Sequence, residues 1–141
     1  MDKTKTETIE LDSMPPAAVA LADIKWFRLA INGIVARVEN YWGDKKFIYL
    51  SPKQKEDDYN KLIKALQRFT KNSVMQFNAE EKPVVPIYRI RKIVIADQKH
   101  KRIELEIEGC AGRQWFIYKD VETLNSDHAK LLELMNAAGQ S

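Results

Sequence analysis

The stretch from Trp26 to Leu50 constrains the fold of this chain more than any other part of the sequence. Apolar residues occupy alternate positions up to Ile31 and alternate again from Ile34, but the phase shifts by one residue at Gly33. Because successive side chains of a strand point to opposite faces, such a shift requires an inserted residue or a sharp bend. Glycine is the residue at which a bulge costs least. We therefore predict one long, strongly coiled strand through Gly33, followed by a short partner strand at Lys46–Leu50.

The clearest single element is a central helix that begins at Ser51 and ends at Asn72. Ser51 is a good N-cap, and Pro52 suits the first helical position because the N–H that it lacks would have no partner there. Apolar residues then recur at helical spacing and make one stripe, at Tyr59, Leu62, Ile63, Leu66 and Phe69. This pattern predicts a helix of about 19 residues that spans one side of a small barrel.

The second half of the chain predicts four further strands and a C-terminal helix. Strand-forming residues dominate Ser73–Asn78, Ile87–Ile95, Arg102–Glu108 and Arg113–Val121. The last helix is expected to begin near Asn125 and to end before Gly139, which stands where a C-cap glycine is expected. We find no internal repeat in the sequence.

The predicted strands Ile87–Ile95 and Arg102–Glu108 form a hairpin whose register follows from burying both apolar sets. That register pairs Ile95 with Ile103, Ile93 with Leu105 and Lys92 with Glu106. The carboxylates of Glu104, Glu106 and Glu108 are then expected to form a solvated row on the outer face.

These elements predict an α+β fold in the order β-β-α-β-β-β-β-α, with one central and one C-terminal helix. Strands joined by short turns in a chain of this size favour a small, strongly coiled antiparallel β-barrel. Two known architectures come close: the oligonucleotide-binding (OB-like) barrel and the pleckstrin-like (PH-like) barrel. We expect residues 1–22 to be a flexible polar and acidic tail, and residues 23–141 to form a single domain.

Composition and charge narrow the class of protein. The chain of 141 residues has one cysteine, Cys110, so it cannot form an internal disulfide. No apolar run approaches the about 18 residues of a membrane span, so we expect no transmembrane segment and a cytoplasmic location. Residues 23–119 hold twenty Lys or Arg against twelve Asp or Glu, a net charge of +8 between acidic ends. A basic body of this kind favours polyanion binding, although solvated surfaces also carry such charge.

Candidate catalytic residues are few. His100, His128 and Cys110 lack the spacing of metal ligands, and the sequence contains no phosphate-binding glycine motif. The acidic row of Glu104, Glu106 and Glu108 is typical of a solvated strand face, whereas paired catalytic carboxylates sit in a cleft. We therefore predict a protein that is not an enzyme, with no metal and no cofactor.

The most informative functional pattern is the interleaving of aromatic and basic residues on predicted strands. Single-stranded nucleic acid is bound by stacking on exposed aromatic rings while cations follow the phosphates. The candidate nucleic-acid-binding residues are Trp26, Arg28, Arg37, Tyr41, Trp42, Lys45, Lys46, Tyr88, Arg89, Arg91, Lys92, Arg113 and Trp115.

Two functions therefore stay open. The first is a non-enzymatic module that binds single-stranded DNA or RNA through this face. The alternative is a PH-like protein-interaction subunit of a larger cytoplasmic assembly, in which an exposed strand edge accepts a partner. The chain could also form homo- or hetero-oligomers.

Overall fold

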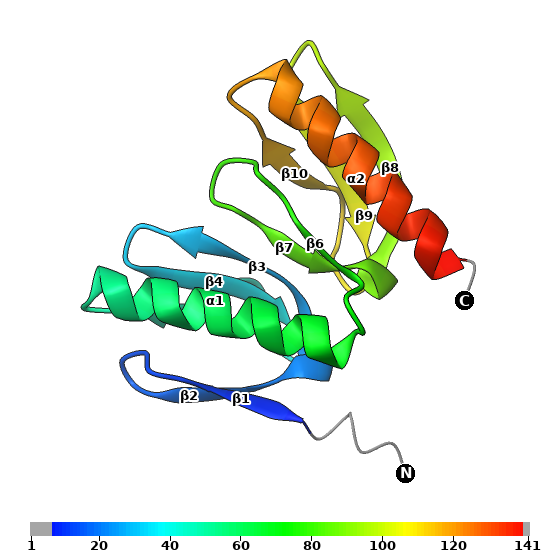
Figure 1. Ribbon diagram of the computed structural model, residues 1–141. Helices are drawn as coiled ribbons and strands as arrows, with labels where there is room; N and C mark the ends of the chain where they lie inside the picture. Colours follow the sequence, from blue (N-terminus) through cyan, green and yellow to red (C-terminus); the bar gives the residue numbers. More distant parts are fainter. Residues whose placement is uncertain (1–6, 140–141) are drawn as a thin grey trace. The chain divides into compact units, whose positions relative to one another are not determined.

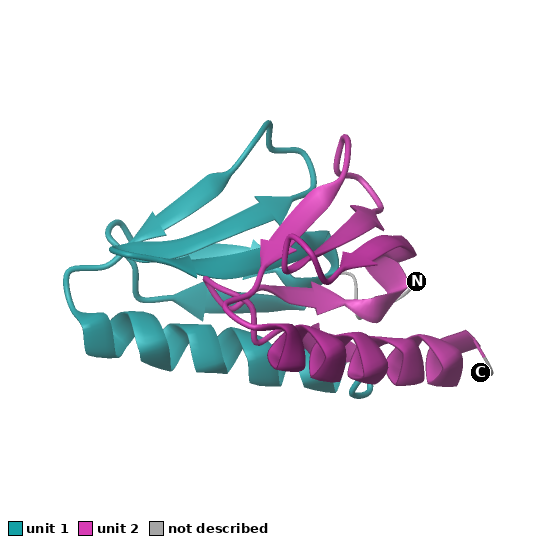
Figure 2. Cartoon of the chain, turned by 90° about the horizontal axis from the view of Figure 1, so that it is seen from above, with its two compact units in different colours: residues 1–72 teal, residues 73–141 magenta. Residues whose placement is uncertain are grey.

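The computed structural model describes residues 7–139 and divides the chain into two compact units. Unit 1 comprises residues 1–72 and unit 2 comprises residues 73–141, as Figure 2 shows in two colours. Each unit is α+β, with antiparallel strands and one long helix (Figure 1). The sequence predicted one domain over residues 23–141, and it gave no sign of a boundary after Asn72. Lys71 and Asn72, which follow the first helix, have left-handed conformations with φ of 56° and 68°.

Unit 1 consists of a β-hairpin, a 3-10 turn, a three-stranded antiparallel meander and a helix. The elements are β1 (Thr8–Leu11), β2 (Ala17–Ala20), η2 (Leu21–Asp23), β3 (Ile24–Ala30), β4 (Gly33–Val38), β5 (Lys45–Ile48) and α1 (Pro52–Phe69). The predicted central helix is confirmed, and the Ser51 hydroxyl accepts a hydrogen bond from the backbone N–H of Gln54. The ring of Tyr59 on α1 meets Phe27 of β3 edge to face, with ring centroids 5.7 Å apart.

The phase shift at Gly33 marks a hairpin, so the prediction of one long bulged strand is wrong. β3 ends at Ala30, Ile31 and Asn32 form the turn, and Ala30 pairs with Gly33 across the two strands. A reversal of the chain shifts the phase of the apolar residues just as a bulge would. A glycine is required at this position because a Cβ on residue 33 would overlap the backbone carbonyl oxygen of Phe47 on β5.

The segment expected to be a flexible tail contains the first hairpin. β1 pairs with β2, with Ile9 opposite Val19 and Leu11 opposite Ala17. Ile9, Leu11 and Val19 are buried, and burial of these alternating side chains accounts for the order of the segment. The part of the expected tail at residues 1–6 lies outside the described residues.

Unit 2 contains the same kinds of element. They are β6 (Val74–Gln76), β7 (Val84–Pro86), η3 (Ile87–Arg89), β8 (Ile90–Asp97), β9 (Arg102–Ile107), β10 (Gln114–Ile117) and α2 (Val121–Gly139). The predicted strand at Ile87–Ile95 starts only at Ile90, because the residues before it form the 3-10 turn. The C-terminal helix starts at Val121 and not near Asn125, because Asp120 caps it by accepting the Thr123 N–H at 2.7 Å.

The register of the β8–β9 hairpin agrees with the prediction in part. Lys92 lies opposite Glu106, and Ile93 opposite Leu105, as expected. A register shift between Ile93 and Ile95 then places Ile95 opposite Glu104, so the predicted pairing of Ile95 with Ile103 is wrong. An inserted residue in one strand changes the face of every side chain beyond it.

The predicted antiparallel α+β class is confirmed, but the closed OB-like or PH-like barrel is not. Over residues 7–139 the strands form open sheets, such as the β1–β2 hairpin and the β10–β9–β8 sheet. The element order also differs from β-β-α-β-β-β-β-α, because five strands precede each helix. The additional strands are β1, β2 and β7, whose three or four residues carry little periodic signal, and one more that arises because the first predicted strand is divided into β3 and β4.

The two units repeat one another in element order. Each begins with two short strands and a 3-10 turn, continues with a three-stranded meander and ends with a helix. Corresponding elements lie 66 residues apart up to β3 and β8, and 69 residues apart from β4 and β9 onward. The change arises because the β8–β9 hairpin is three residues longer than the β3–β4 hairpin. The sequence analysis missed this repeat, although Phe47-Ile48-Tyr49 recurs as Phe116-Ile117-Tyr118.

Hydrogen bonds at equivalent positions support the repeat. In unit 1 the Tyr49 hydroxyl donates to buried Asp58 at 2.7 Å, and the backbone N–H of Asp12 donates to the same oxygen at 2.7 Å. In unit 2 the Tyr118 hydroxyl donates to buried Asp127 at 2.7 Å, and the backbone N–H of Asn78 donates to the same oxygen at 2.6 Å. We call each arrangement the tyrosine–aspartate clasp. It joins the residue after the last strand, the helix and the loop after the first strand.

Candidate nucleic-acid interface

Three connections of unit 2 meet at one end of its strands. They are the β6–β7 loop at Asn78–Lys82, the β8–β9 turn at Gln98–Lys101 and the link from β10 to α2 at Lys119–Asp120. The Glu80 N–H donates to the Ile117 carbonyl at 2.8 Å, and the Tyr118 N–H donates to the Lys101 carbonyl at 2.7 Å. We call this surface the charged end of unit 2.

The clasp of unit 2 holds the β6–β7 loop in place at this end. Asp127 accepts the Tyr118 hydroxyl and both the backbone and side-chain N–H groups of Asn78. Burial, and then the hydrogen bond to Asp127, raise the pKa of Tyr118 well above its ordinary value, so the hydroxyl stays protonated and keeps donating. The loop therefore rests on a buried, charge-assisted network and not on solvent-exposed contacts alone.

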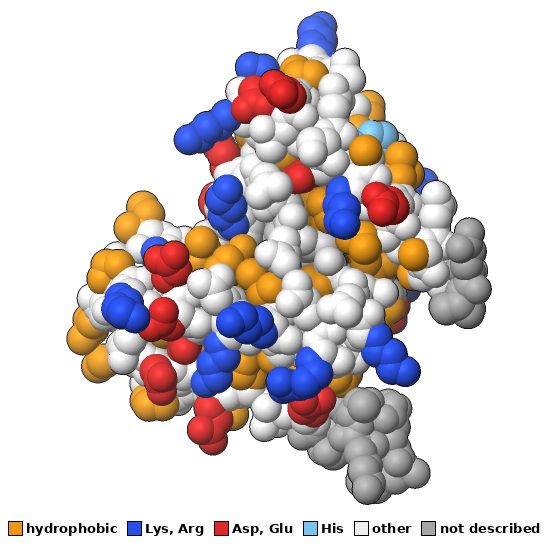
Figure 3. All heavy atoms as spheres, in the orientation of Figure 1, with side chains coloured by type: hydrophobic (Ala, Val, Ile, Leu, Met, Phe, Trp, Pro, Cys, Tyr) orange, Lys and Arg blue, Asp and Glu red, His pale blue; other side chains and the backbone are white. Residues whose placement is uncertain are grey.

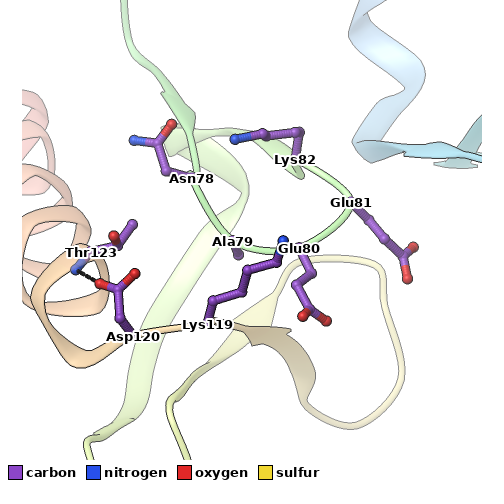
Figure 4. A pocket seen from close by; sticks show the side chains of 8 residues that line it. All are labelled: Asn78, Ala79, Glu80, Glu81, Lys82, Lys119, Asp120 and Thr123. Atoms are coloured by element: carbon purple, nitrogen blue, oxygen red, sulfur yellow. Dashed lines mark hydrogen bonds between the residues drawn. The ribbon is translucent and has the colours of Figure 1, made fainter.

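Four lysines project from these connections: Lys82, Lys99, Lys101 and Lys119, all with exposed side chains. The Lys101 ammonium lies 3.4 Å from the Lys119 carbonyl oxygen, which ties the β8–β9 turn to the link before α2. A hollow of about 360 Å³ has a lining that includes Lys82, Lys119 and Thr123 of α2. Figure 4 shows these side chains. In this view Lys119 extends toward the β6–β7 loop.

Two of the acidic groups at this end, Asp97 and Asp120, form hydrogen bonds with residues three positions along the chain. Asp97 contacts the His100 ring nitrogen at 2.7 Å and accepts the His100 N–H, and these hydrogen bonds lower its pKa. Asp120 caps α2, and the hydrogen bond from the Thr123 N–H lowers its pKa. Glu80 and Glu81 are the exposed carboxylates of the β6–β7 loop. The charged end therefore presents lysines on turns, and exposed lysine side chains can contact phosphate groups.

The equivalent end of unit 1 has the same backbone contacts and different side chains. The Met14 N–H donates to the Ile48 carbonyl, and the Tyr49 N–H donates to the Asn32 carbonyl, both at 2.8 Å. The side chains here are apolar and exposed, with Ile31 92%, Leu50 77%, Met14 58% and Ile48 44% accessible. We call this surface the apolar end of unit 1.

The predicted site residues in unit 1 lie mainly on its three-stranded meander. Arg28 of β3 and Arg37 of β4 both approach the Asp44 carboxylate, Arg28 at 3.8 Å and Arg37 in a direct ion pair. Lys46 of β5 lies opposite Val35 and is exposed. The structure thus brings two predicted arginines together, but around an acidic group that partly neutralises them.

The aromatic residues of unit 1 do not form one stacking surface. Trp42 is 99% exposed in the turn between β4 and β5, next to half-exposed Tyr41. The Lys45 ammonium lies 5.4 Å from the Tyr41 ring centroid. Trp26 of β3 is buried, so the prediction that it stacks on a ligand is unsupported by its placement.

The predicted residues of unit 2 fall in two places. Tyr88 is exposed on η3, whereas Arg89 is buried with its guanidinium 5.5 Å from the Tyr88 ring centroid. Arg91 and Lys92 are exposed on β8. Burial of Arg89 removes it from any ligand-binding surface of the unit.

The remaining two residues lie on and beside β10. Trp115 is half-exposed, and the Arg102 guanidinium covers its ring at 4.1 Å from the centroid. Arg113 lies 3.4 Å from Glu104, which Arg102 also approaches at 2.9 Å. Glu104 is buried, so the expected solvated row of glutamates is wrong at this position, where two arginines and Trp115 surround the carboxylate.

The lysines of the charged end were not among the predicted site residues. Lys99 and Lys101 flank His100 within the predicted β8–β9 hairpin loop, and this basic turn is the signal that the sequence offered. Lys82 and Lys119 lie 37 residues apart in the chain, so only the fold brings them to the same hollow.

Among the residues that the structure describes, His100, His128 and Cys110 do not belong to a group of side chains that could hold a metal ion. Within residues 7–139, no group of three or more His, Cys, Asp or Glu side chains could hold a metal ion. Neither of the two helices in this part of the chain is long and apolar enough to cross a membrane.

Comparison with known proteins identifies the fold. No protein-family model matches the sequence, and no curated protein matches it. Among solved structures, the chain is similar to the LytTr DNA-binding domain of a Bacillus cereus response regulator, with a TM-score of 0.54 and 14% identity. The match covers 89% of this chain and 95% of that domain. The fold is therefore LytTR-like.

Proposed function

We propose that this chain binds double-stranded DNA through the charged end of unit 2. The observation that carries the proposal is the similarity of fold to a LytTr DNA-binding domain over 89% of the chain. A shared fold supports a shared function only when a site on the chain can perform it. The charged end supplies such a site.

The lysines of the charged end suit contacts with phosphates. Lys82, Lys99, Lys101 and Lys119 are exposed on three connections that backbone hydrogen bonds hold together. A lysine that neutralises a phosphate releases a bound counterion, which makes affinity fall steeply with salt. Protruding turns can also enter a groove of the duplex, where base edges are accessible.

The placement of the tryptophans favours a duplex over a single strand as the ligand. A single-strand platform requires several aromatic rings along one groove. Trp26 is buried, Trp115 is covered by Arg102, and Trp42 stands in a turn of unit 1. Single-strand binding through the sequence-predicted residues, with Tyr41, Trp42 and Lys46 as the exposed members in unit 1, is the competing proposal.

The experiment is a fluorescence-anisotropy titration of the full chain with a labelled duplex and with one of its strands. Measurements at about 50 and about 200 mM salt give the salt dependence of the affinity. The double variant K99Q/K119Q should lower the slope of log K against log salt by about 1.8, since each lost phosphate contact removes about 0.9. Lys130→Gln, an exposed lysine on α2, is the matched control for loss of charge and should leave the slope within about 0.3 of that of the unaltered chain.

Two results would reject the proposal. Duplex affinity that is insensitive to K99Q/K119Q would exclude the charged end as the interface. Tighter binding of the single strand, lost on Trp42→Ala, would favour the competing proposal.

A further inference from the structure

We propose that the groove between β1 and α1 of unit 1 binds an extended acidic peptide segment of a protein partner, which adds as a strand to the free edge of β1. This inference is independent of DNA binding. The groove has a volume of about 740 Å³ and is lined by Thr8, Ile9 and Glu10 of β1 and by residues of α1, chiefly Lys61, Lys64 and Arg68.

The edge of β1 that faces α1 carries backbone groups that β2 does not use. In an antiparallel pair, bonded and non-bonded residue pairs alternate. The Leu21 N–H donates to the Glu7 carbonyl, and with the observed register this makes the Thr8–Ala20 and Glu10–Ala18 pairs non-bonded. The N–H and C=O groups of Thr8 and Glu10 therefore point away from β2. The Lys61 ammonium of α1 reaches the Glu10 carbonyl at 2.6 Å, which confirms that this edge faces the helix.

The opposite wall of the groove is a row of exposed cations. Lys61, Lys64 and Arg68 recur at i, i+3 and i+7, so they lie on one side of α1. The row spans about 10 Å along the helix at 1.5 Å per residue. Alternate side chains of a strand are about 6.8 Å apart, so two carboxylates on one face of an added strand can both reach the row. Figure 3 shows Lys and Arg side chains gathered over α1.

The groove already holds one contact of the proposed kind. The Arg68 guanidinium lies 3.4 Å from the carboxylate of Glu7, the residue immediately before β1. The carboxylate of Asp57, which lines the groove, lies 2.9 Å from the ammonium of Lys53, which does not line it. The lining carries three cations against the carboxylates of Glu10 and Asp57, so the balance of charge favours an acidic occupant.

The strand edge selects a peptide over a nucleic acid. The Thr8 carbonyl requires an N–H donor, and the Thr8 and Glu10 N–H groups require acceptors at strand spacing. A peptide backbone supplies both at that spacing, whereas a phosphodiester chain supplies only acceptors.

Unit 2 gives an internal control for this interpretation. The positions equivalent to Lys61, Lys64 and Arg68 are 130, 133 and 137, which are lysine, glutamate and alanine. The row of cations is therefore a feature of α1 alone and not of the repeated frame.

The test uses the full chain and a fluorescein-labelled peptide of alternating Glu and Thr. Anisotropy should show saturable binding, and K64E/R68E should weaken it by more than tenfold. Lys130→Glu, the matched change on α2, should leave the affinity within twofold. In a second peptide every Thr is replaced by proline. This peptide keeps the charge but lacks the N–H donors of one strand edge, and it should bind at least tenfold more weakly.

Three outcomes would overturn the proposal. One is no saturable binding up to about 1 mM peptide, the weak end of specific recognition. Another is equal binding of the proline peptide, which would mean charge attraction without strand addition. The third is a loss of duplex affinity on K64E/R68E as large as the loss of peptide affinity, which would assign the row of cations to phosphate contacts.

Discussion

Units 1 and 2 share an internal frame and differ in what they present to the solvent. Both place the tyrosine that follows the last strand, an aspartate of the helix and a backbone N–H in the same clasp. The ends built on that frame differ, since one exposes Ile31 and Leu50 and the other exposes Lys99 and Lys119.

The difference shows which parts of a repeated unit are free to change. Buried hydrogen bonds tolerate few substitutions because each unsatisfied partner is costly, whereas exposed loop residues change at little cost to stability. Unit 1 has thirteen Lys or Arg against ten Asp or Glu, and unit 2 has ten of each. The net charge of the chain therefore belongs to unit 1, and its cations gather on α1, while the lysines of unit 2 are concentrated on turns.

The largest expected effect comes from breaking the clasp. Asp58→Ala and Asp127→Ala should each lower the free energy of unfolding by about 3 kcal/mol, because a buried tyrosine hydroxyl and a backbone N–H lose their acceptor. Urea denaturation measures the change. Asp57→Ala, an exposed neighbour of Asp58, should change stability by less than about 0.5 kcal/mol. A large loss for only one of the two clasp variants would contradict their equivalence.

The next effect is specific to unit 1. Gly33→Ala should destabilise by about 2 kcal/mol, because the new methyl group overlaps the backbone carbonyl of Phe47. Ala30→Gly alters the residue paired with Gly33 without adding an atom and should cost about 0.5–1 kcal/mol. Thermal denaturation of both variants measures the two losses of stability. An alanine at position 33 that costs less than the glycine at position 30 would contradict the close approach of β4 and β5.

Alkaline pH should act more strongly on unit 1 through Tyr59, whose equivalent in unit 2 is His128. Burial raises the pKa of Tyr59 from 10.0 to about 12. A raised folded-state pKa means that the stabilisation is complete below pH 10 and is lost as pH rises from 10 to 12. The slope is at most about 1.4 kcal/mol per pH unit. Urea denaturation between these pH values should show a shallower loss for Tyr59→Phe, and an equal slope would contradict the burial of the hydroxyl.

The smallest expected effects are at the helix caps, where the units use different residues for the same purpose. Ser51→Ala and Asp120→Ala should each cost about 1 kcal/mol, because the Gln54 or Thr123 N–H loses its acceptor. The exchanges Ser51→Asp and Asp120→Ser keep an acceptor and should be nearly neutral in urea denaturation. A cost for the exchanges as large as for alanine would show that the caps are not interchangeable between the units.

The sequence predicted the elements with strong periodic signals. The helix after Ser51 and the Lys92–Glu106 register both depend on local spacing, and both agree with the structure. The hairpin at Ile31-Asn32 was mistaken for a bulge because a reversal and an inserted residue shift the apolar phase alike. The short strands β1, β2 and β7 were missed because three or four residues carry too little pattern.

The candidate site was less predictable than the fold. Residue type identified cations and aromatic rings, but burial of Trp26 and Arg89 depends on packing that spacing does not encode. The pairing of Arg37 with Asp44 likewise depends on the turn between β4 and β5. Lys82 and Lys119 line the same hollow because the Glu80–Ile117 backbone contact and the clasp of Asn78 with Asp127 join distant parts of the chain.

The most direct test of DNA binding at the charged end of unit 2 removes acidic side chains there, so the expected change in duplex affinity is a gain and not a loss. Glu80→Gln/Glu81→Gln removes two exposed carboxylates of the β6–β7 loop and should raise duplex affinity severalfold at about 100 mM salt, because like-charge repulsion with the phosphates is removed. Glu133→Gln, an exposed glutamate of α2, should change it by less than twofold at the same salt. An unchanged affinity for the loop variant, or an equal gain for Glu133→Gln, would contradict DNA binding at this end of the molecule.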